Sequence, residues 1–235
     1  MAKRPDDQRP RSRSLSNDGA DCRVSAMTSA HLPLQNRVLP TGEIVSDPAR
    51  GTFTGNRGIL PFDARKLGTS RWKHPHWIIC TLTHPKGRYH GPQPTRGWTP
   101  LFFLDEAVGL AAGHRPCAYC RPKAYKSFVQ AWQQATGERV LHKEMDRVLH
   151  AARVTRSREQ IRHIHPLHEL PTGAMIVWRD QPHLVLPKTL APYAPHGYGP
   201  HLPRPQEEVT VLTPAPTIAV LRAGYRPKWH KTAES

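Results

Sequence analysis

The first half of the chain contains short apolar segments that predict strands. Residues 76–83 (HWIICTLT) combine Trp, Ile and Thr, which suit a pleated and half-buried surface. Residues 85–87 (PKG) end this strand, and residues 101–103 (LFF) predict a second, shorter one. Residues 36–62 are rich in glycine and proline, so we expect a turn-rich leader there with one or two short strands.

Three later segments carry the spacing of apolar residues that is typical of amphipathic helices. The first helix is expected over 106–112, with Asp105 as its N-cap. The second is expected at about 123–136, just after Pro122, a residue that suits the first position of a helix. The third is expected over 142–153.

From residue 166 the pattern changes to short apolar runs between turns. Three runs predict strands, and they lie at 174–178, 181–186 and 209–212. A loop rich in Pro, Gly, His and Tyr is expected at 192–205, and a short helix with Thr213 as its cap follows the last strand. We therefore predict an α+β protein in which packed helices are followed by a small β-rich unit.

The charge of the chain adds a class of partner to this picture. The sequence has 34 Lys and Arg against 18 Asp and Glu, a net charge of +16. Residues 1–30 hold six basic and four acidic residues, so most of the surplus lies in the body of the chain. A basic body favours polyanionic partners, nucleic acid first.

Export and membrane insertion are not expected. No run of about 18 apolar residues occurs that could span a membrane as a helix. The first residues, MAKRPDDQRPRSRS, lack the apolar stretch of a secretory signal. We therefore expect a cytoplasmic protein whose four cysteines stay reduced.

Three of these cysteines predict a metal site. Cys117 and Cys120 form a Cys-x-x-Cys pair at the start of the helix expected after Pro122, where the helix dipole favours thiolates. Such a turn brings two sulfurs to about 3.5–4 Å, as a tetrahedral zinc with Zn–S bonds of about 2.3 Å requires. Cys80, in the strand at 76–83, supplies a third sulfur. We therefore expect Zn²⁺ as the cofactor.

The fourth ligand and two other interpretations stay open. His84 follows Cys80 by four residues and is the first choice, with His150 and His114 as alternatives. A Cys-x-x-Cys pair also occurs as a redox dithiol, and Cys80 can be an ordinary core residue. The pair does not follow a clear strand in a thioredoxin-like pattern, which argues against the redox interpretation.

Residues 101–122, LFFLDEAVGLAAGHRPCAYCRP, resemble the second half of the zinc-binding domain of the Ada DNA repair proteins. The likeness covers roughly residues 77–122, and the chain as a whole resembles bacterial proteins that carry this run. It implies that Cys80, Cys117 and Cys120 match three of the four zinc-binding cysteines, and His84 takes the place of the fourth.

The same resemblance implies chemistry on DNA. Cys80 matches the cysteine that accepts a methyl group from a DNA phosphotriester. A histidine at position 84 weakens that reaction, because three thiolates and an imidazole carry less negative charge than four thiolates. Arg115 and Arg121 would then lie beside the site, where they suit a phosphate.

A basic run between residues 138 and 163 provides further candidates for nucleic-acid contact. Arg147 and Arg153 belong to it, and the run holds only four acidic residues. It can follow a phosphate backbone, although a solvated helix face gives the same pattern.

A histidine-rich segment suggests a different class of function. His163, His165 and His168 lie close together in sequence and, with His150 or Glu169, can form a second, catalytic metal site. The alternative function is thus a metal-dependent enzyme that acts on nucleic acid through residues 142–168. Ordinary polar histidines on turns would give the same pattern.

These expectations divide the chain into three parts. Residues 1–35 are expected to be a disordered basic tail, 36–137 an Ada-like zinc-binding domain, and 138–235 a helical linker with the β-rich unit. Residues 196–201 (HGYGPH) and 224–230 (GYRPKWH) are expected at the rim of a pocket. The expected function is a mainly structural zinc in a protein that contacts DNA, in DNA damage handling. A protein-binding module with structural zinc is a third possibility.

Overall fold

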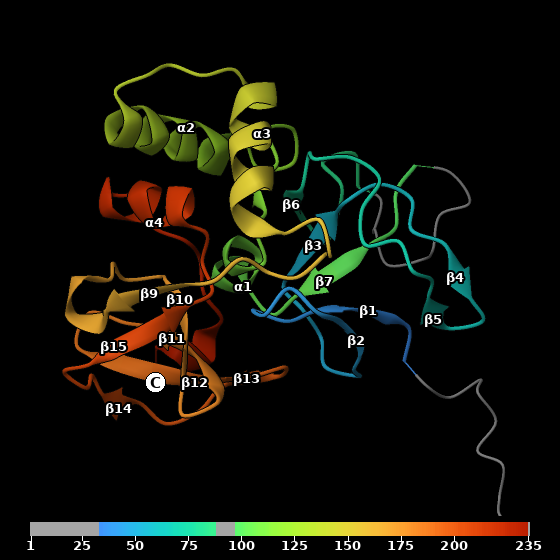
Figure 1. Ribbon diagram of the computed structural model, residues 1–235. Coiled ribbons are helices and arrows are strands. Elements are labelled where there is room, and N and C mark those ends of the chain that lie inside the picture. The colour runs from blue at the N-terminus through green and yellow to red at the C-terminus, as the bar shows by residue number, and fades with distance from the viewer. Residues whose placement is uncertain (1–32, 88–96, 235) are drawn as a thin grey trace, which may run out of the picture. The chain divides into compact units, whose positions relative to one another are not determined.

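A computed structural model describes residues 33–87 and 97–234 of the chain. Residues 32–235 form one compact unit. Most of the predicted tail, 1–35, lies outside the described residues, and Cys22 lies there too. The described residues form four α-helices and three sheets, which confirms the predicted α+β class (Figure 1).

The first sheet is built by residues 35–116. Its strand order is β2-β1-β7-β3-β6-β8. The strands are β1 (Gln35–Val38), β2 (Ile44–Ser46), β3 (Phe53–Asn56), β6 (Ile78–Thr81), β7 (Leu101–Phe103) and β8 (Arg115–Pro116). A separate hairpin pairs β4 (Phe62–Asp63) with β5 (Lys66–Leu67). The predicted strands at 76–83 and 101–103 are β6 and β7.

The leader holds more strands than its composition predicts. We expected one or two strands over 36–62, whereas β1, β2 and β3 all belong to the sheet. β7 lies between β1, with which it is parallel, and β3, with which it is antiparallel. These pairings are long-range, so no local pattern of apolar residues announces them.

The second sheet is antiparallel and is built by residues 163–211. Its order is β13-β12-β11-β10-β15-β9, and β14 pairs with β12. The strands are β9 (His163–Pro166), β10 (Met175–Trp178), β11 (Gln181–Val185), β12 (Thr189–Ala194), β13 (Gly197–Tyr198), β14 (Leu202–Pro203) and β15 (Glu208–Val211). The three strands predicted here are β10, β11 and β15.

The prediction of a loop over residues 192–205 is wrong in part. This segment contains the end of β12 and all of β13 and β14. Tyr193 and Tyr198 face each other across the β12–β13 pair, with ring centroids 6.1 Å apart, and both are buried. Burial of these rings favours pairing despite the glycines and prolines nearby.

The helices follow their predicted signals closely. They are α1 (Glu106–Ala111), α2 (Pro122–Thr136), α3 (His142–Arg153) and α4 (Ala215–Arg222). The Asp105 carboxylate accepts the Val108 N–H and caps α1, as predicted. Thr213 does not cap α4, because its hydroxyl accepts the Met175 N–H from β10 and Pro214 takes the cap position.

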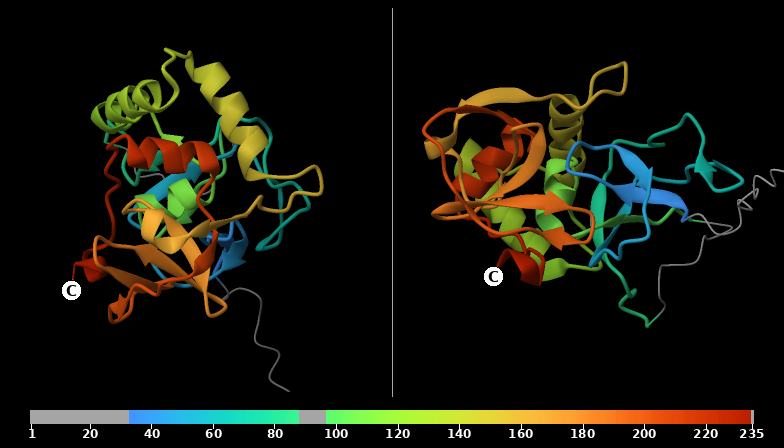
Figure 2. Two further views of the ribbon diagram at one scale, coloured as in Figure 1. Left: turned by 60° about the vertical axis from the view of Figure 1, so that its left-hand side comes forward. Right: turned by 90° about the horizontal axis from the view of Figure 1, so that it is seen from below.

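Helix α1 lies at the centre of the core. All six of its residues are buried, and it contacts β7 of the first sheet and β10 of the second. Figure 2 shows the two sheets on opposite sides of this helix. Helix α4 packs against α2 and α3 and lies above the second sheet in the view of Figure 1. The boundary predicted between residues 137 and 138 falls in the connection between α2 and α3.

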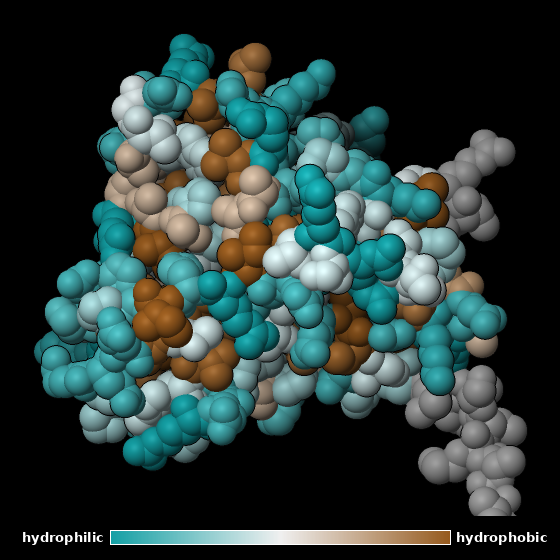
Figure 3. Space-filling model, viewed as in Figure 1, coloured by the Kyte–Doolittle hydropathy of each residue, from teal (hydrophilic) through white to brown (hydrophobic). Residues whose placement is uncertain are grey.

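The outer surface is predominantly hydrophilic on the face that Figure 3 shows, with apolar residues scattered among polar ones. Among the described residues, no helix has the length and apolar character needed to cross a membrane.

Candidate metal centre

Two neighbouring strands place Cys80 beside Cys117. β6 and β8 are parallel, with Ile79 opposite Pro116. The Cys117 N–H donates to the Ile79 carbonyl at 2.9 Å, which continues this pairing past the end of β8. Because paired strands run about 4.8 Å apart, the next residue of each chain segment lies beside the other, and these residues are the two cysteines.

The turn that begins α2 brings in the third sulfur. The Arg121 N–H donates to the Cys117 carbonyl at 3.0 Å, and the Cys120 N–H points to the Cys117 Sγ at 3.5 Å. The sulfur atoms of Cys80, Cys117 and Cys120 all lie within 4.8 Å of one another. In residues 33–87 and 97–234 no other group of three His, Cys, Asp or Glu comes together in this way. The structure thus joins the three predicted cysteines.

Burial and hydrogen bonding divide the roles of the three thiols. Cys80 and Cys117 are only 3% and 7% exposed, whereas Cys120 is half-buried. Hydrogen bonds to Cys117 and Cys120, together with burial, raise the pKa of Cys80. The hydrogen bond from Cys80 lowers the pKa of Cys117 to about 5, against the effect of burial. The same donor lowers the pKa of Cys120.

These shifts describe a cluster that is ready for a cation. The pKa of Cys80 is raised and those of Cys117 and Cys120 are lowered, so the latter two thiols favour the thiolate form. A thiophilic metal ion can displace protons from such a cluster and be held by all three sulfurs. Cys80, the candidate methyl acceptor, is the most buried of the three cysteines.

His84 lies near the cluster but is not one of the grouped residues. Its ring centroid is 5.3 Å from that of Tyr119, which lies between the two cysteines of the α2 turn. Its Nδ1 accepts the Lys86 N–H at 3.0 Å. His84 as the fourth ligand stays a prediction.

The two alternative ligands belong to a different part of the interior. The Arg57 Nε donates to His114 Nε2 at 3.0 Å, and His114 Nδ1 is 3.2 Å from the Gly109 carbonyl, so both ring nitrogens are engaged. His150 Nδ1 accepts from Arg153 at 2.8 Å. Neither histidine is grouped with the cysteines.

Three of the four arginines predicted to contact nucleic acid lie inside the protein. Arg115 is paired with Asp146 and Arg121 with Glu106, each at 2.7 Å, and both arginines are buried. Arg153 is buried as well, whereas Arg147 is exposed on α3. Contact between these arginines and nucleic acid stays a prediction, and in this structure only Arg147 faces outward.

A cavity of about 540 Å³ adjoins the cluster at Cys120. Exposed basic residues line it from two distant parts of the chain: Lys123 from α2, and Arg226 and Lys228 from the C-terminal segment. Residues 224–230 thus contribute to a pocket, as predicted, whereas residues 196–201, predicted at the same rim, do not line this cavity. No sequence signal connects this segment to the cysteines, because only the packing of α4 against α2 brings it there.

The histidine-rich segment does not form a second group of ligands among the described residues. His163 and His165 lie on β9, and His168 lies in the 3₁₀ turn Leu167–Glu169. His165 Nε2 is 3.0 Å from an Arg222 nitrogen, a cation that disfavours a metal ion at that atom. The geometry therefore lends no support to a catalytic metal at these histidines.

Comparison of the chain with known protein families, with curated proteins and with solved structures gave no match. The resemblance to the Ada domain therefore stays a prediction from the sequence, and the geometry of the three sulfurs is the direct structural argument for a metal.

Proposed function

We propose that the protein binds one zinc ion through Cys80, Cys117 and Cys120, with His84 as the fourth ligand. The convergence of three sulfurs within 4.8 Å carries this proposal. Three thiolates and an imidazole form a common tetrahedral zinc site, and soft sulfur ligands select zinc over magnesium or calcium. His84 lies in the segment after β6, and its ring centroid is 5.3 Å from that of Tyr119 in the cysteine turn.

The metal is proposed to be mainly structural. Its ligands would join the end of β6, the end of β8 and the first turn of α2, three elements that meet at one corner of the first sheet. Two of the three sulfur-bearing residues are buried. A metal there closes the chain between residues 80 and 117 and so stabilises the folded state relative to the unfolded one.

We further propose that the surface beside this centre contacts DNA, in DNA damage handling. Lys123, Arg226 and Lys228 line the cavity next to Cys120, and the net charge of +16 favours a polyanion. The connection with damage handling rests on the resemblance to the Ada domain alone.

Metal content measured by native mass spectrometry tests the first proposal. The purified chain, supplied with zinc, is expected to carry one ion, and Cys80→Ser and Cys117→Ser are expected to lose it. Cys22→Ser is the control, since the sequence assigns this thiol to the tail and not to the predicted ligand set, and this variant should keep the ion. Zinc retained by Cys80→Ser would overturn the proposed ligand set. In His84→Ala the ion is expected to bind more weakly, because water replaces the imidazole, and an unchanged affinity for zinc would exclude His84 as the fourth ligand.

DNA affinity measured against salt concentration tests the second proposal. The dissociation constant should rise steeply with salt, and Lys123→Ala with Lys228→Ala should weaken binding and flatten the slope. Lys188→Ala, an exposed lysine that does not line the cavity, is the control. Equal effects of the two sets of variants would contradict a contact at this cavity.

A further inference from the structure

Two buried arginines enclose the ring of Trp77. The guanidinium carbons of Arg57 and Arg153 lie 3.8 and 3.9 Å from the ring centroid. Two guanidinium groups cannot both stand that close to one face, so they lie on opposite faces. The arginines are 2% and 1% exposed. Gly113 makes room for this packing, because a Cβ atom there would be 2.4 Å from the Arg153 Cδ.

Neither arginine has a carboxylate partner among the described ion pairs. Arg57 donates to His114, whose pKa burial and the neighbouring arginines hold well below its ordinary value, so that the ring is neutral. Arg153 donates to the carbonyl oxygens of Gly113 and Pro75. The Arg57 Nη2 and the Arg153 Nε are buried without any hydrogen-bond partner.

The Asp146 carboxylate, whose charge opposes the lowering of the Arg153 pKa by burial, is already engaged by Arg115 and His76. Burial, followed by the charge of Arg71, lowers the pKa of Arg57 to about 9. Burial and the charge of Arg57 also lower the pKa of Arg153. Buried charges are normally paired. Among the described ion pairs, the chain supplies no carboxylate partner for Arg57 or Arg153, so a bound anion can serve as their counter-ion.

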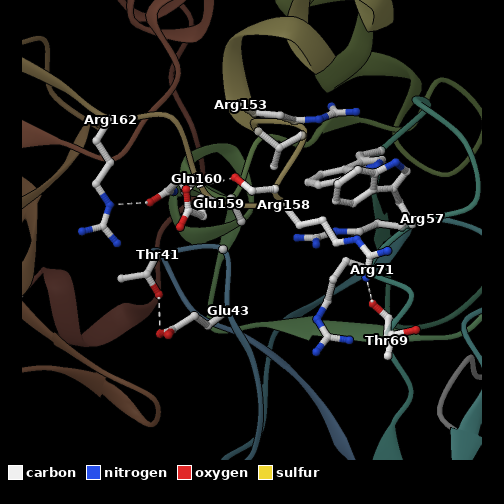
Figure 4. A pocket seen from close by; sticks show the side chains of 16 residues that line it. Thr41, Glu43, Arg57, Thr69, Arg71, Arg153, Arg158, Glu159, Gln160 and Arg162 are labelled. Carbon is white, nitrogen blue, oxygen red and sulfur yellow. Dashed lines mark hydrogen bonds between the residues drawn. The ribbon is translucent and has the colours of Figure 1, made fainter.

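Both arginines line a cavity of about 530 Å³ that also receives Arg71 and Arg158. The Arg158 Nη1 donates to the Thr69 carbonyl at 2.6 Å, and Arg71 donates to the Gly68 carbonyl, so one short segment holds both side chains. Figure 4 shows Arg57, Arg71 and Arg158 gathered on one side of the cavity. Arg158 has a φ of 71°, a conformation that is costly for a residue with a side chain.

Acidic residues are present at the cavity but lie apart from this cluster. Glu43 accepts from Thr41, and Glu159 accepts from Ser157. In Figure 4 both carboxylates lie across the cavity from Arg57 and Arg71. They leave the positive side of the cavity open to an anion.

We propose that this arginine pocket, formed by Arg57, Arg71 and Arg158 beside Trp77, binds the phosphate monoester of a nucleotide, while Arg153 packs on the opposite face of Trp77. Planar guanidinium groups match the oxygens of a phosphate, and three of them supply enough positive charge for a dianion. Trp72, half-buried in the cavity wall, offers its ring to a base. The volume lies within the range of small-molecule sites.

The arginine pocket is distinct from the cysteine cluster. Trp77 precedes β6 and Cys80 is its third residue, so the two sites lie about 10 Å apart along one strand. Likewise His114 precedes β8 and Cys117 follows it. The phosphate proposal depends neither on zinc nor on DNA contact at the cavity beside Cys120.

Isothermal titration calorimetry on the full chain tests the proposal. It measures the dissociation constants of a nucleoside 5′-monophosphate, of the matching nucleoside and of inorganic phosphate. The monophosphate is expected to bind most tightly, phosphate more weakly, and the nucleoside not measurably. Arg158→Gln and Arg71→Gln should each weaken the monophosphate at least about tenfold, since each removes a charged donor. Neither residue is fully buried, so both variants should fold.

Arg156→Gln is the matched control, because Arg156 is exposed on the same segment and does not line the cavity. Equal binding of nucleoside and monophosphate would overturn the proposal, as would equal losses in Arg156→Gln and Arg158→Gln. The phosphate monoester can belong to a strand end or to a free nucleotide. The affinities of an oligonucleotide with and without a 5′-phosphate, compared with that of the free nucleotide, distinguish these two sources. Preference for the phosphorylated oligonucleotide over the free nucleotide assigns the pocket to strand ends, and the reverse assigns it to free nucleotides.

Discussion

Arg115 and Asp146 form a buried bidentate ion pair, with both nitrogen–oxygen distances at 2.7 Å. Asp146 is wholly buried in α3, and Arg115 lies in β8, two residues before Cys117. The arginine that the sequence placed beside a DNA phosphate is thus fully used within the protein. The pair connects α3 to the strand that carries the cysteine turn.

Replacing Asp146 should therefore destabilise the protein strongly. Asp146→Ala leaves the Arg115 guanidinium buried without its partner, which is expected to cost about 3–5 kcal/mol of unfolding free energy. The exposed pair of Glu144 and Arg147 on the same helix is the control, and Glu144→Ala should cost at most about 1 kcal/mol. Urea unfolding of the two variants measures the difference. Equal losses of unfolding free energy in the two variants would show that the buried Arg115–Asp146 pair stabilises the protein no more than the exposed pair does.

Stability should fall on mild acidification because of His114. Burial, Arg57 and Arg153 hold its folded-state pKa well below the value of about 6.5 expected in the unfolded chain. Between these two values the unfolded state binds more protons, so the unfolding free energy decreases as pH falls below about 6.5, by at most about 1.4 kcal/mol per pH unit for one group. His150, whose pKa burial and Arg153 lower to about 4, acts in the same direction.

Urea unfolding at a series of pH values from about 7.5 down to about 5 measures how the unfolding free energy depends on pH. His114→Gln removes the titrating ring, so its stability should depend less on pH than that of the natural chain. A slope that is the same in both proteins would contradict the role of His114.

Thiol reactivity after zinc removal should follow exposure and pKa. Cys120 is half-buried and its pKa is lowered, so an alkylating reagent should modify it first. Cys80, buried and with a raised pKa, should react last. Peptide mapping by mass spectrometry at short reaction times gives the order. Early modification of Cys80 would show that the metal-free cluster does not keep the geometry described here.

The secondary structure was predictable where local signals are strong. Asp105 caps α1, Pro122 begins α2, and Gly137 ends it in a left-handed conformation with φ of 74°. Each of these depends on chemistry within one turn of chain. The strands β12 to β14 were missed because pairing with β11 and with one another, and not a local alternation, defines them.

The cysteine site was predictable for a different reason. Spacing fixes the distance between Cys117 and Cys120, and Cys80 is the one remaining cysteine in the body of the chain. The arginine pocket has no comparable signal. Arg57 lies in the leader and Arg153 at the end of α3, and only the fold brings them to opposite faces of Trp77.

The central claim is a zinc ion held by three sulfurs, and X-ray absorption at the zinc edge tests it most directly. For the zinc-loaded natural chain we predict three sulfur neighbours at about 2.3 Å and one nitrogen at about 2.0–2.1 Å. His84→Ala should replace the nitrogen by oxygen from water and leave the sulfurs in place. A spectrum of the natural chain with fewer than three sulfur neighbours would contradict the account.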